Sequence, residues 1–451
     1  MPCWAAIVAG AVLIVPLIGA CASTATPASA TPTSAAATAV PAAEPTPATS
    51  PGTRGRAGGV SRTQARIAFL AERVKDDPND GDAQLELGLA LLQRIRETAD
   101  PSLYGPAGAA LRASRRLLPG DPQPLVGLGG LQLGRHEFTE ALATARSALA
   151  IAPGSVSASS IEVDALIELG EYDAAFDAVE ALASRSPDLT TLSRLSYSRE
   201  LRGDIEGALA AMREAAESPS LAAENTSFAL SIVGHLERLN GDPDAARSSF
   251  ERALKLVPSH APSLAGLGRL AVGDGDLHAA GTYFERAAAI VPLAEYVIAL
   301  GETYLAGGDS EAALRQFDLA RAEITLFNAN GVAADLDLAL FEADHGDHDQ
   351  ALIYAEAAYD AAPTIRAADA LAWCLLRNGR TAEALLRSRE ALRLGSRDPL
   401  LLYHAGMIEA DGGDFEAARA HLAAALAADP GFSAIGARDA RTLLGGLPTP
   451  S

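Results

Sequence analysis

A spacing of 33 or 34 residues recurs through the chain and constrains its fold more than any other feature. Gly234, Gly268 and Gly301 mark the same point in three successive copies, 34 and 33 residues apart. Each copy also has a large apolar residue before this glycine and a Gly-Asp pair, an Ala, a Phe and a second Ala after it; in the middle copy these are Leu264, Gly275-Asp276, Ala280, Phe284 and Ala287. Such a period is typical of stacked supersecondary units that each pack only on their neighbours.

The residue types in each copy predict two antiparallel helices joined by a tight turn. A small residue lets the two helices approach closely, and the Phe fills the space between successive hairpins. The Gly-Asp pair turns the chain between the helices. Pro258 and Pro292 end the second helix, because proline lacks an N–H and clashes with the preceding turn. The hydrophobic share of 49% with only 5% aromatic residues fits helices packed through Ala, Leu and Val.

This pattern resembles the tetratricopeptide repeat, which implies an all-α, right-handed superhelical solenoid of antiparallel helix pairs. Weaker copies extend the array over residues 61–445, as about ten hairpins followed by a capping helix over 433–444. A lone helix from Ala65 to Asp77 precedes the first hairpin, and about seven extra residues lie around Asp100. Thr325 replaces the terminating proline of its copy, so we expect a longer helix or a different loop there. Residues 446–451 form a tail.

In this family the first helix of each hairpin lines a concave groove, with repeat positions 2, 5, 9 and 12 facing inward. Mapping these positions gives the expected partner-binding residues Tyr197, Phe228, His235, Arg238, Arg269, Ile298, Glu302, Arg366, Asp369, Trp373, Tyr403 and Met407. Aromatic side chains and Arg are enriched at the centres of protein interfaces, which favours a peptide or protein ligand. A subfamily that clamps acidic C-terminal tails uses Lys and Asn in the groove, and position 9 here has neither. That ligand class is therefore not expected.

The formal net charge of −21 argues against a nucleic-acid partner, because the phosphate backbone would be repelled. An anionic membrane surface is an equally poor partner for the folded part. We therefore expect contact with a membrane only through an N-terminal lipid or anchor.

Catalytic signatures are missing from the sequence. It contains no HExxH, GxSxG or Walker A motif, and the glycines of 127–130 lie within an expected helix. The polar run from Asp344 to Asp349 contains possible metal ligands, but it falls at a turn between helices, where polar residues are usual. Cys374 stands alone and is expected to be a small buried side chain. We therefore expect neither an enzyme, a cofactor nor a metal; a catalytic site without a sequence signature is the least favoured hypothesis.

The first sixty residues have a different character. Residues 3–20 are almost wholly apolar, and Ile18-Gly19-Ala20-Cys21 resembles the lipobox of bacterial lipoproteins. The resemblance implies a signal peptide over 1–21, a lipid on Cys21, and an extracytoplasmic, membrane-anchored protein of the bacterial cell envelope. No Lys or Arg precedes Arg54, which departs from that pattern. An uncleaved anchor and an ordinary signal peptide are the alternatives. Residues 22–60, rich in Ala, Thr, Pro and Ser, are expected to form a disordered linker.

Two functional hypotheses follow from these observations. The first is an exported scaffold that binds a peptide or protein partner in its concave groove. The alternative is an accessory protein of cell-envelope or polysaccharide assembly and export that binds glycan. A groove dominated by aromatic platforms would favour sugar, whereas a mixture of Arg, Glu and apolar side chains favours peptide.

Overall fold

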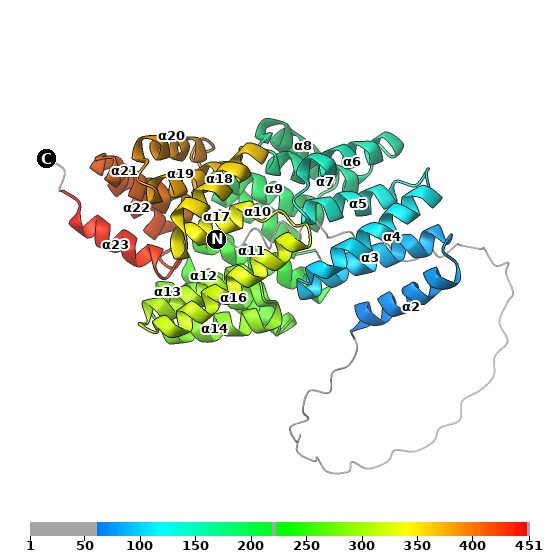
Figure 1. Ribbon diagram of the computed structural model, residues 1–451, viewed down its shortest axis with the longest axis horizontal. Helices are drawn as coiled ribbons and strands as arrows, with labels where there is room; N and C mark the ends of the chain where they lie inside the picture. Colours follow the sequence, from blue (N-terminus) through cyan, green and yellow to red (C-terminus); the bar gives the residue numbers. More distant parts are fainter. Residues whose placement is uncertain (1–60, 219–221, 449–451) are drawn as a thin grey trace, which may run out of the picture.

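The computed structural model describes residues 61–218 and 222–448, and this part of the chain consists of helices without strands (Figure 1). The α-helices are α2 (Arg62–Asp76), α3 (Gly81–Thr98), α4 (Tyr104–Leu117), α5 (Gln123–Gly134), α6 (Phe138–Ile151), α7 (Val156–Glu168), α8 (Tyr172–Arg185), α9 (Leu189–Leu201), α10 (Ile205–Ala216), α11 (Ala223–Leu239), α12 (Pro243–Leu256), α13 (Ala261–Gly273), α14 (Leu277–Ile290), α15 (Ala294–Ala306), α16 (Ser310–Ala329), α17 (Asp335–His345), α18 (His348–Ala361), α19 (Ile365–Arg377), α20 (Thr381–Ala391), α21 (Pro399–Asp411), α22 (Phe415–Ala428) and α23 (Gly436–Gly446).

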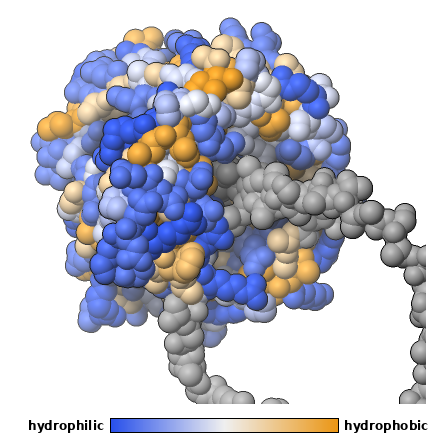
Figure 2. Space-filling view, turned by 90° about the vertical axis from the view of Figure 1, so that its right-hand side faces the viewer, coloured by the Kyte–Doolittle hydropathy of each residue, from blue (hydrophilic) through white to orange (hydrophobic). Residues whose placement is uncertain are grey.

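Consecutive helices pair as hairpins, from α3–α4 to α21–α22, while α2 packs on α3 and α23 packs on α21 and α22. The odd-numbered helices from α3 to α21 are the inner ones. Of the 13 residues of α13, for example, eleven are buried, whereas only four of the 14 residues of α14 are. The expected all-α solenoid of helix pairs is confirmed. Viewed from the right-hand side of Figure 1, the surface is largely hydrophilic, with small scattered apolar areas (Figure 2).

The Gly-Asp pairs build the turns between inner and outer helices. Gly275 adopts a φ of +79°, a left-handed conformation that costs glycine little because it has no Cβ. Asp276 then caps the next helix, since its side chain accepts a hydrogen bond from the main-chain N–H of Ala279. The pairs before α10, α12, α16 and α22 repeat both features. One dipeptide therefore ends one helix and starts the next.

The small residue at the repeated glycine position allows the two helices of a hairpin to lie close together. A Cβ at Gly268 would lie 2.8 Å from the ring of Phe284, and one at Gly301 would meet Phe317 in the same way. Each glycine thus leaves the space that the aromatic ring of its own hairpin fills. The sequence predicted that the Phe fills the space between successive hairpins. In the structure it also packs within its own hairpin.

The array is irregular at two places that the sequence had marked. The extra residues near Asp100 form a 3-10 turn (Pro101–Leu103) and the start of α4, and the Tyr104 hydroxyl donates a hydrogen bond to the carbonyl of Gly134 at 2.8 Å. Where Thr325 replaces proline, α16 does not end, and this helix reaches Ala329 with a total length of 20 residues. The absence of a proline lets the helix run on, which lengthens the connection to α17.

The long α16 helps to bring distant parts of the chain together, because Phe327 near its end and Val332 after it pack into the apolar cluster formed by α3 to α7. Arg135, in the turn between α5 and α6, donates from its Nε to the carbonyl of Gly331 at 2.9 Å. The main-chain N–H of Ala333 donates to the carbonyl of Arg135 at 3.2 Å. These bonds join one turn of the superhelix to the next.

Similar contacts follow along the same line. The hydroxyl of Tyr172 accepts a hydrogen bond from the main-chain N–H of Ile365 at 3.0 Å. Arg238 forms an ion pair with Asp429, and Nη1 of Arg269 donates to the carbonyl of Phe432 at 3.0 Å. We call this line of contacts, from Arg135 to Phe432, the inter-turn seam. These contacts join segments across the concave side, where the sequence placed the groove.

Candidate functional site

The twelve expected groove residues all lie on inner helices, and none of them is exposed. Eight are buried and four, Phe228, Glu302, Arg366 and Met407, are half-buried. The structure brings six of them together around a single cavity of about 170 Å³, namely Arg269, Ile298, Glu302, Trp373, Tyr403 and Met407. We call this space the C-terminal cavity. Inner helices α13, α15, α17, α19 and α21 form its walls, and residues between 432 and 439 also line it.

Two carboxylates from α15 face the C-terminal cavity, and their environments differ. Glu302 accepts a hydrogen bond from the Ser433 hydroxyl at 2.8 Å, and its Oε1 lies 3.5 Å from Nε2 of His345. Burial by itself would raise the pKa of Glu302, but His345 and Ser433 outweigh it, so the pKa is lowered. Burial raises the pKa of Glu295 to about 7, although the positive charge of Arg269 acts against this. Helix α15 therefore presents one stable anion and one carboxyl that burial tends to keep neutral.

The aromatic side chains of the cavity pack mainly on one another. The ring of Trp373 stacks on His404 with centroids 4.2 Å apart, and its Nε1 donates to Asp344 at 2.8 Å. Tyr403 lies between Trp373 and Phe432, at centroid distances of 5.6 and 5.4 Å. Because these rings are already in contact with each other, Trp373 is a wall of the cavity and not a free flat platform.

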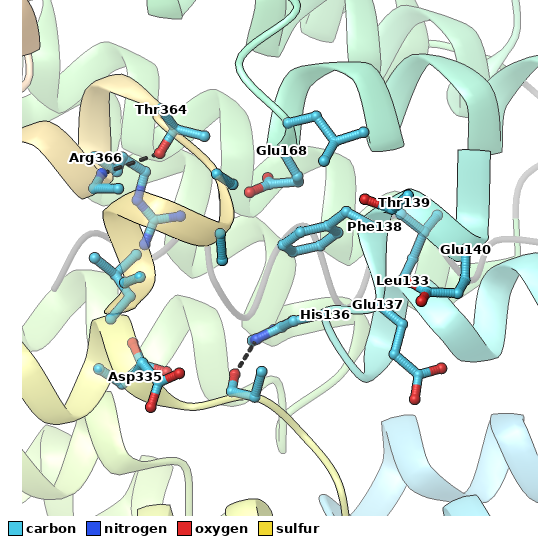
Figure 3. A pocket seen from close by; sticks show the side chains of 18 residues that line it. Leu133, His136, Glu137, Phe138, Thr139, Glu140, Glu168, Asp335, Thr364 and Arg366 are labelled. Atoms are coloured by element: carbon cyan, nitrogen blue, oxygen red, sulfur yellow. Dashed lines mark hydrogen bonds between the residues drawn. The ribbon is translucent and has the colours of Figure 1, made fainter. Parts of the chain in front are cut away.

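Arg366 belongs to a second cavity, of about 310 Å³, which lies at the inter-turn seam (Figure 3). Arg366 enters from α19, and Glu168 enters at the opposite wall from the end of α7, with the Phe138 ring nearby (Figure 3). Burial raises the pKa of Glu168, against the opposing effect of Arg366. His136 borders this cavity and its Nδ1 lies 2.6 Å from the carbonyl of Ala333. This seam cavity is thus formed by two turns of the superhelix together.

The other five expected groove residues have partners within the fold. Nε2 of His235 lies 3.1 Å from Glu200, and its Nδ1 lies 3.0 Å from Arg238. Asp369 lies 2.9 Å from His404, and burial raises the pKa of that carboxyl although His404 opposes the shift. Tyr197 and Phe228 pack in the apolar core around α9 and α11. These five side chains do not line the C-terminal cavity.

The polar run from Asp344 to Asp349 is divided between structural roles. His345 points inward, with a side chain only 7% exposed that stacks on Phe317 at 4.0 Å between ring centroids. Asp347 caps α18 by accepting bonds from the N–H groups of Asp349 and Gln350. Among residues 61–218 and 222–448, no group of three or more His, Cys, Asp or Glu side chains is placed to hold a metal ion. The run is therefore only partly the solvated turn that the sequence indicated.

Sequence reasoning missed several cavity residues, and their signals differ. Glu295 occupies position 2 of its repeat, one of the four positions expected to face inward, so the pattern could have selected it. His345 and His404 occupy none of those positions, and only the packing of α17 against α15 and of α21 against α19 reveals them.

No described helix combines the length and the apolar character that crossing a membrane requires.

A family model described as tetratricopeptide repeat matches residues 234–295, 298–364 and 370–431. The chain carries tetratricopeptide repeats. The matched tetratricopeptide region includes inner helices α13 to α21, so the walls of the C-terminal cavity lie within it. The sequence finds no match among the curated proteins.

Solved structures of similar fold include a tetratricopeptide repeat protein from Parabacteroides merdae, at 19% identity over 59% of this chain and 99% of that one, with a TM-score of 0.39. The human IFIT1 dimer with PPP-AAAA has 15% identity over 82% of this chain and 95% of that one, at a TM-score of 0.42. PilW, a type IV pilus biogenesis factor, has 18% identity over 46% of this chain and 97% of that one, at 0.38. These similarities concern the fold alone.

Proposed function

We propose that this protein is an exported scaffold, tethered to the membrane of a bacterial cell envelope, that binds a segment of a partner protein in its C-terminal cavity. The tetratricopeptide fold supports a role in protein–protein interaction. The strongly negative net charge supports a protein partner over a nucleic acid. Neither a cofactor nor catalysis is part of the proposal.

The observation that carries this proposal is the convergence of five inner helices on one cavity. Six of the twelve groove positions chosen from the repeat pattern line it, and they combine an Arg, a Glu, two aromatic and two aliphatic side chains. Ligand pockets for drug-sized molecules occupy roughly 300 to 1,000 Å³, well above the 170 Å³ found here. The cavity therefore suits one anchoring side chain of a partner and not a whole extended peptide.

Export and tethering rest on the N-terminal sequence alone. Residues 1–60, including the lipobox-like Ile18-Gly19-Ala20-Cys21, lie outside the described residues. Within the proposal, Cys21 carries the lipid and residues 22–60 form the linker to the repeats at 61–445. The lipid then holds the solenoid near the membrane while the cavity remains available to partners.

The glycan alternative is less well supported by the cavity. Sugar rings usually stack on the open face of an aromatic side chain, whereas Trp373 stacks on His404 and Tyr403 contacts Phe432. A partner segment needs only a lined hole of suitable size and charge. We therefore retain the peptide ligand as the proposed one and treat glycan binding as an outcome that the following experiment can reveal.

The test is affinity capture from envelope extracts, followed by mass spectrometry, with variants that fill the cavity. Ala299 lines the cavity and is half-buried, so Ala299→Phe would occupy the space without removing any hydrogen bond. Ala306→Phe, at the end of the same helix and outside the cavity lining, is the matched control. A circular dichroism spectrum and thermal unfolding curve establish that both variants keep the fold.

We expect one defined protein to be retained by the wild type and by Ala306→Phe, and lost with Ala299→Phe. Chemical crosslinking of that protein to residues 432–439 would place the contact at the cavity. Equal retention by all three forms would remove the cavity from the proposal. Retention of cell-wall glycan by the wild type, lost with Ala299→Phe, would support the alternative.

A further inference from the structure

The seam cavity differs from the C-terminal cavity in size and in position. At about 310 Å³ it reaches the range of roughly 300 to 1,000 Å³ in which small-molecule sites usually fall. One turn of the superhelix supplies residues between 133 and 140 and the end of α7. The next turn supplies the start of α17 and residues between 358 and 367. A small molecule held in this cavity would therefore contact both turns at once.

Two side chains of opposite charge enter the seam cavity from opposite walls, Arg366 from α19 and Glu168 from the end of α7 (Figure 3). Both are half-buried, and neither side chain forms a hydrogen bond or a direct ion pair within the part of the chain that the structure describes. Their charges act on each other across the space. The cavity thus has a positive wall and a negative wall.

The other carboxylates around the seam cavity are balanced by the fold or reach solvent. Glu137 pairs with Arg135 at 3.2 Å, and Glu140 is exposed. Asp335 and Asp337 lie in the first turn of α17, where the positive end of the helix dipole stabilises negative charge. These four carboxylates also make the cavity unfavourable for a ligand that carries only a negative charge.

A ligand with one charge of each sign matches this arrangement. A ligand with a single charge is attracted by one wall and repelled by the other, whereas a zwitterion can direct its carboxylate to Arg366 and its ammonium group to Glu168. The guanidinium group of Arg also fits the planar geometry of a carboxylate. The same space is lined by the apolar side chains of Phe138, Leu169 and Leu336, which can hold an apolar group. A free amino acid with an apolar side chain combines all three features.

We propose that the seam cavity binds a free α-amino acid with an apolar side chain, its carboxylate facing Arg366 and its ammonium group facing Glu168. This site is separate from the C-terminal cavity, so the inference does not depend on the proposed partner binding. The bound amino acid links α7 to α19 and thereby adds a further contact to the inter-turn seam. Because it binds only the folded protein, it also raises the temperature of unfolding.

The test is isothermal titration calorimetry of the full-length protein with L-leucine and L-phenylalanine. The N-acetyl derivative of each lacks the ammonium charge, and the amide derivative of each lacks the carboxylate, so every derivative removes one of the two proposed contacts. We expect at least one of the two amino acids to bind saturably. Both of its derivatives should bind at least tenfold more weakly, because each loses a charge-assisted contact.

Four charge-neutralising variants locate the site. Glu168→Gln and Arg366→Gln each remove one wall charge, while Glu311→Gln and Arg252→Gln remove the same charges from exposed positions on outer helices. The affinity for the amino acid should fall at least tenfold in the first pair and stay unchanged in the second. Glu168→Gln should not weaken the N-acetyl derivative further, since that ligand has no ammonium group to lose. Thermal unfolding curves establish that the variants are folded.

The comparison of derivatives on the wild type needs no variant, so it decides the proposal even where a substitution disturbs folding. Binding of neither amino acid at millimolar concentration would overturn the proposal. So would equal binding of an amino acid and one of its derivatives, because the cavity would then not recognise both charges. Unchanged affinity in either Glu168→Gln or Arg366→Gln would overturn it as well. None of these results affects the capture experiment with Ala299→Phe, which concerns the C-terminal cavity.

Discussion

Nε of Arg135 donates a hydrogen bond to the carbonyl of Gly331, a residue 196 positions farther along the chain, at 2.9 Å. The bond joins the turn between α5 and α6 to the loop before α17, so it links two turns of the superhelix. Contacts within a repeat array usually reach only the neighbouring unit. This one, together with the rest of the inter-turn seam, adds a longer-range link to the solenoid.

Removing the Arg135 side chain should loosen the seam without unfolding the hairpins. Arg135→Ala deletes the bond to Gly331, which is worth about 0.5–1.5 kcal/mol for a typical hydrogen bond. We expect faster hydrogen–deuterium exchange at Ala333, whose N–H donates to the carbonyl of Arg135, and unchanged exchange within α13. Arg146→Ala, which removes an exposed Arg away from the seam, is the control and should leave Ala333 protected. Unchanged protection of Ala333 in Arg135→Ala would mean that the side chain does not hold the seam.

The packing of Gly268 against Phe284 predicts a strong coupling between the two positions. Gly268→Ala places a Cβ 2.8 Å from the ring and should destabilise the protein by about 1–3 kcal/mol, as overpacking of a core usually does. Phe284→Leu alone leaves a small void, but it should restore room for the new methyl group in the double variant. Urea unfolding of the wild type, both single variants and the double variant gives the coupling energy. Additive effects would contradict the close contact.

Cys374 should be inert towards thiol reagents in the folded protein. It is fully buried, and burial raises the pKa of its thiol to about 12, so the reactive thiolate is scarce at neutral pH. Iodoacetamide labelling at pH 8, read by peptide mass spectrometry, should modify Cys374 only after urea is added. Rapid modification of this residue in the native protein would show that α19 opens frequently.

Glu295 should make the stability of the protein without ligand depend on pH. Its pKa is about 7 in the folded state, because of burial, against 4.5 in the unfolded chain, so the folded state favours the protonated form. The stability that this carboxyl contributes is therefore fully present below pH 4.5 and is lost as the pH rises through 7. Arg269 on α13 counteracts this effect, and Asp337 on α17 strengthens it.

The loss expected between pH 5 and pH 8 is up to about 3 kcal/mol, since each unit of pKa shift corresponds to about 1.4 kcal/mol. Glu295→Gln has no such proton to lose. Urea unfolding at both pH values should thus show the variant gaining stability relative to the wild type as the pH increases. If the stability of the two proteins depended on pH in the same way, the ionisation of Glu295 would not lower the stability of the folded state.

Replacing Cys21 tests the proposed anchor. Cys21→Ser removes the thiol that the lipobox-like sequence would present for lipid attachment. We expect the wild type in the membrane fraction, with a lipidated N-terminal peptide detected by mass spectrometry, and Cys21→Ser in another fraction or unprocessed. A Cys21→Ser protein that still sediments with membranes would favour the uncleaved anchor.

The sequence predicted the local architecture well because that architecture depends on neighbouring residues. One hairpin is marked by a glycine, a Gly-Asp pair seven positions after that glycine, and a Phe sixteen positions after the same glycine. Gly268 and Phe284 are such a pair, and they are in contact in the structure. The missing proline at Thr325 indicated either a longer helix or a different loop, and the structure has the longer helix. Such features are set by helix propensity, capping and close packing within about 34 residues.

The inter-turn seam and the C-terminal cavity could not be predicted from the sequence in the same way. Whether Arg135 reaches Gly331 depends on the sum of the small rotations between all the intervening hairpins, and no single position encodes that sum. The groove positions were therefore placed on the correct helices, yet His235 and Asp369 became buried partners of other side chains. Glu295 was within reach of the pattern, but its burial beside the C-terminal cavity appears only in three dimensions.

The inter-turn seam also limits how the chain can change length. Tyr172 meets Ile365 and Arg269 meets Phe432 only because a fixed number of hairpins separates each pair. One hairpin inserted between α13 and α16 would fall within the span of every contact in the seam, so all these bonds would be lost together. Growth or shortening of the array is thus compatible with the present structure only at its two ends, in contrast to an open solenoid, which tolerates a new repeat anywhere.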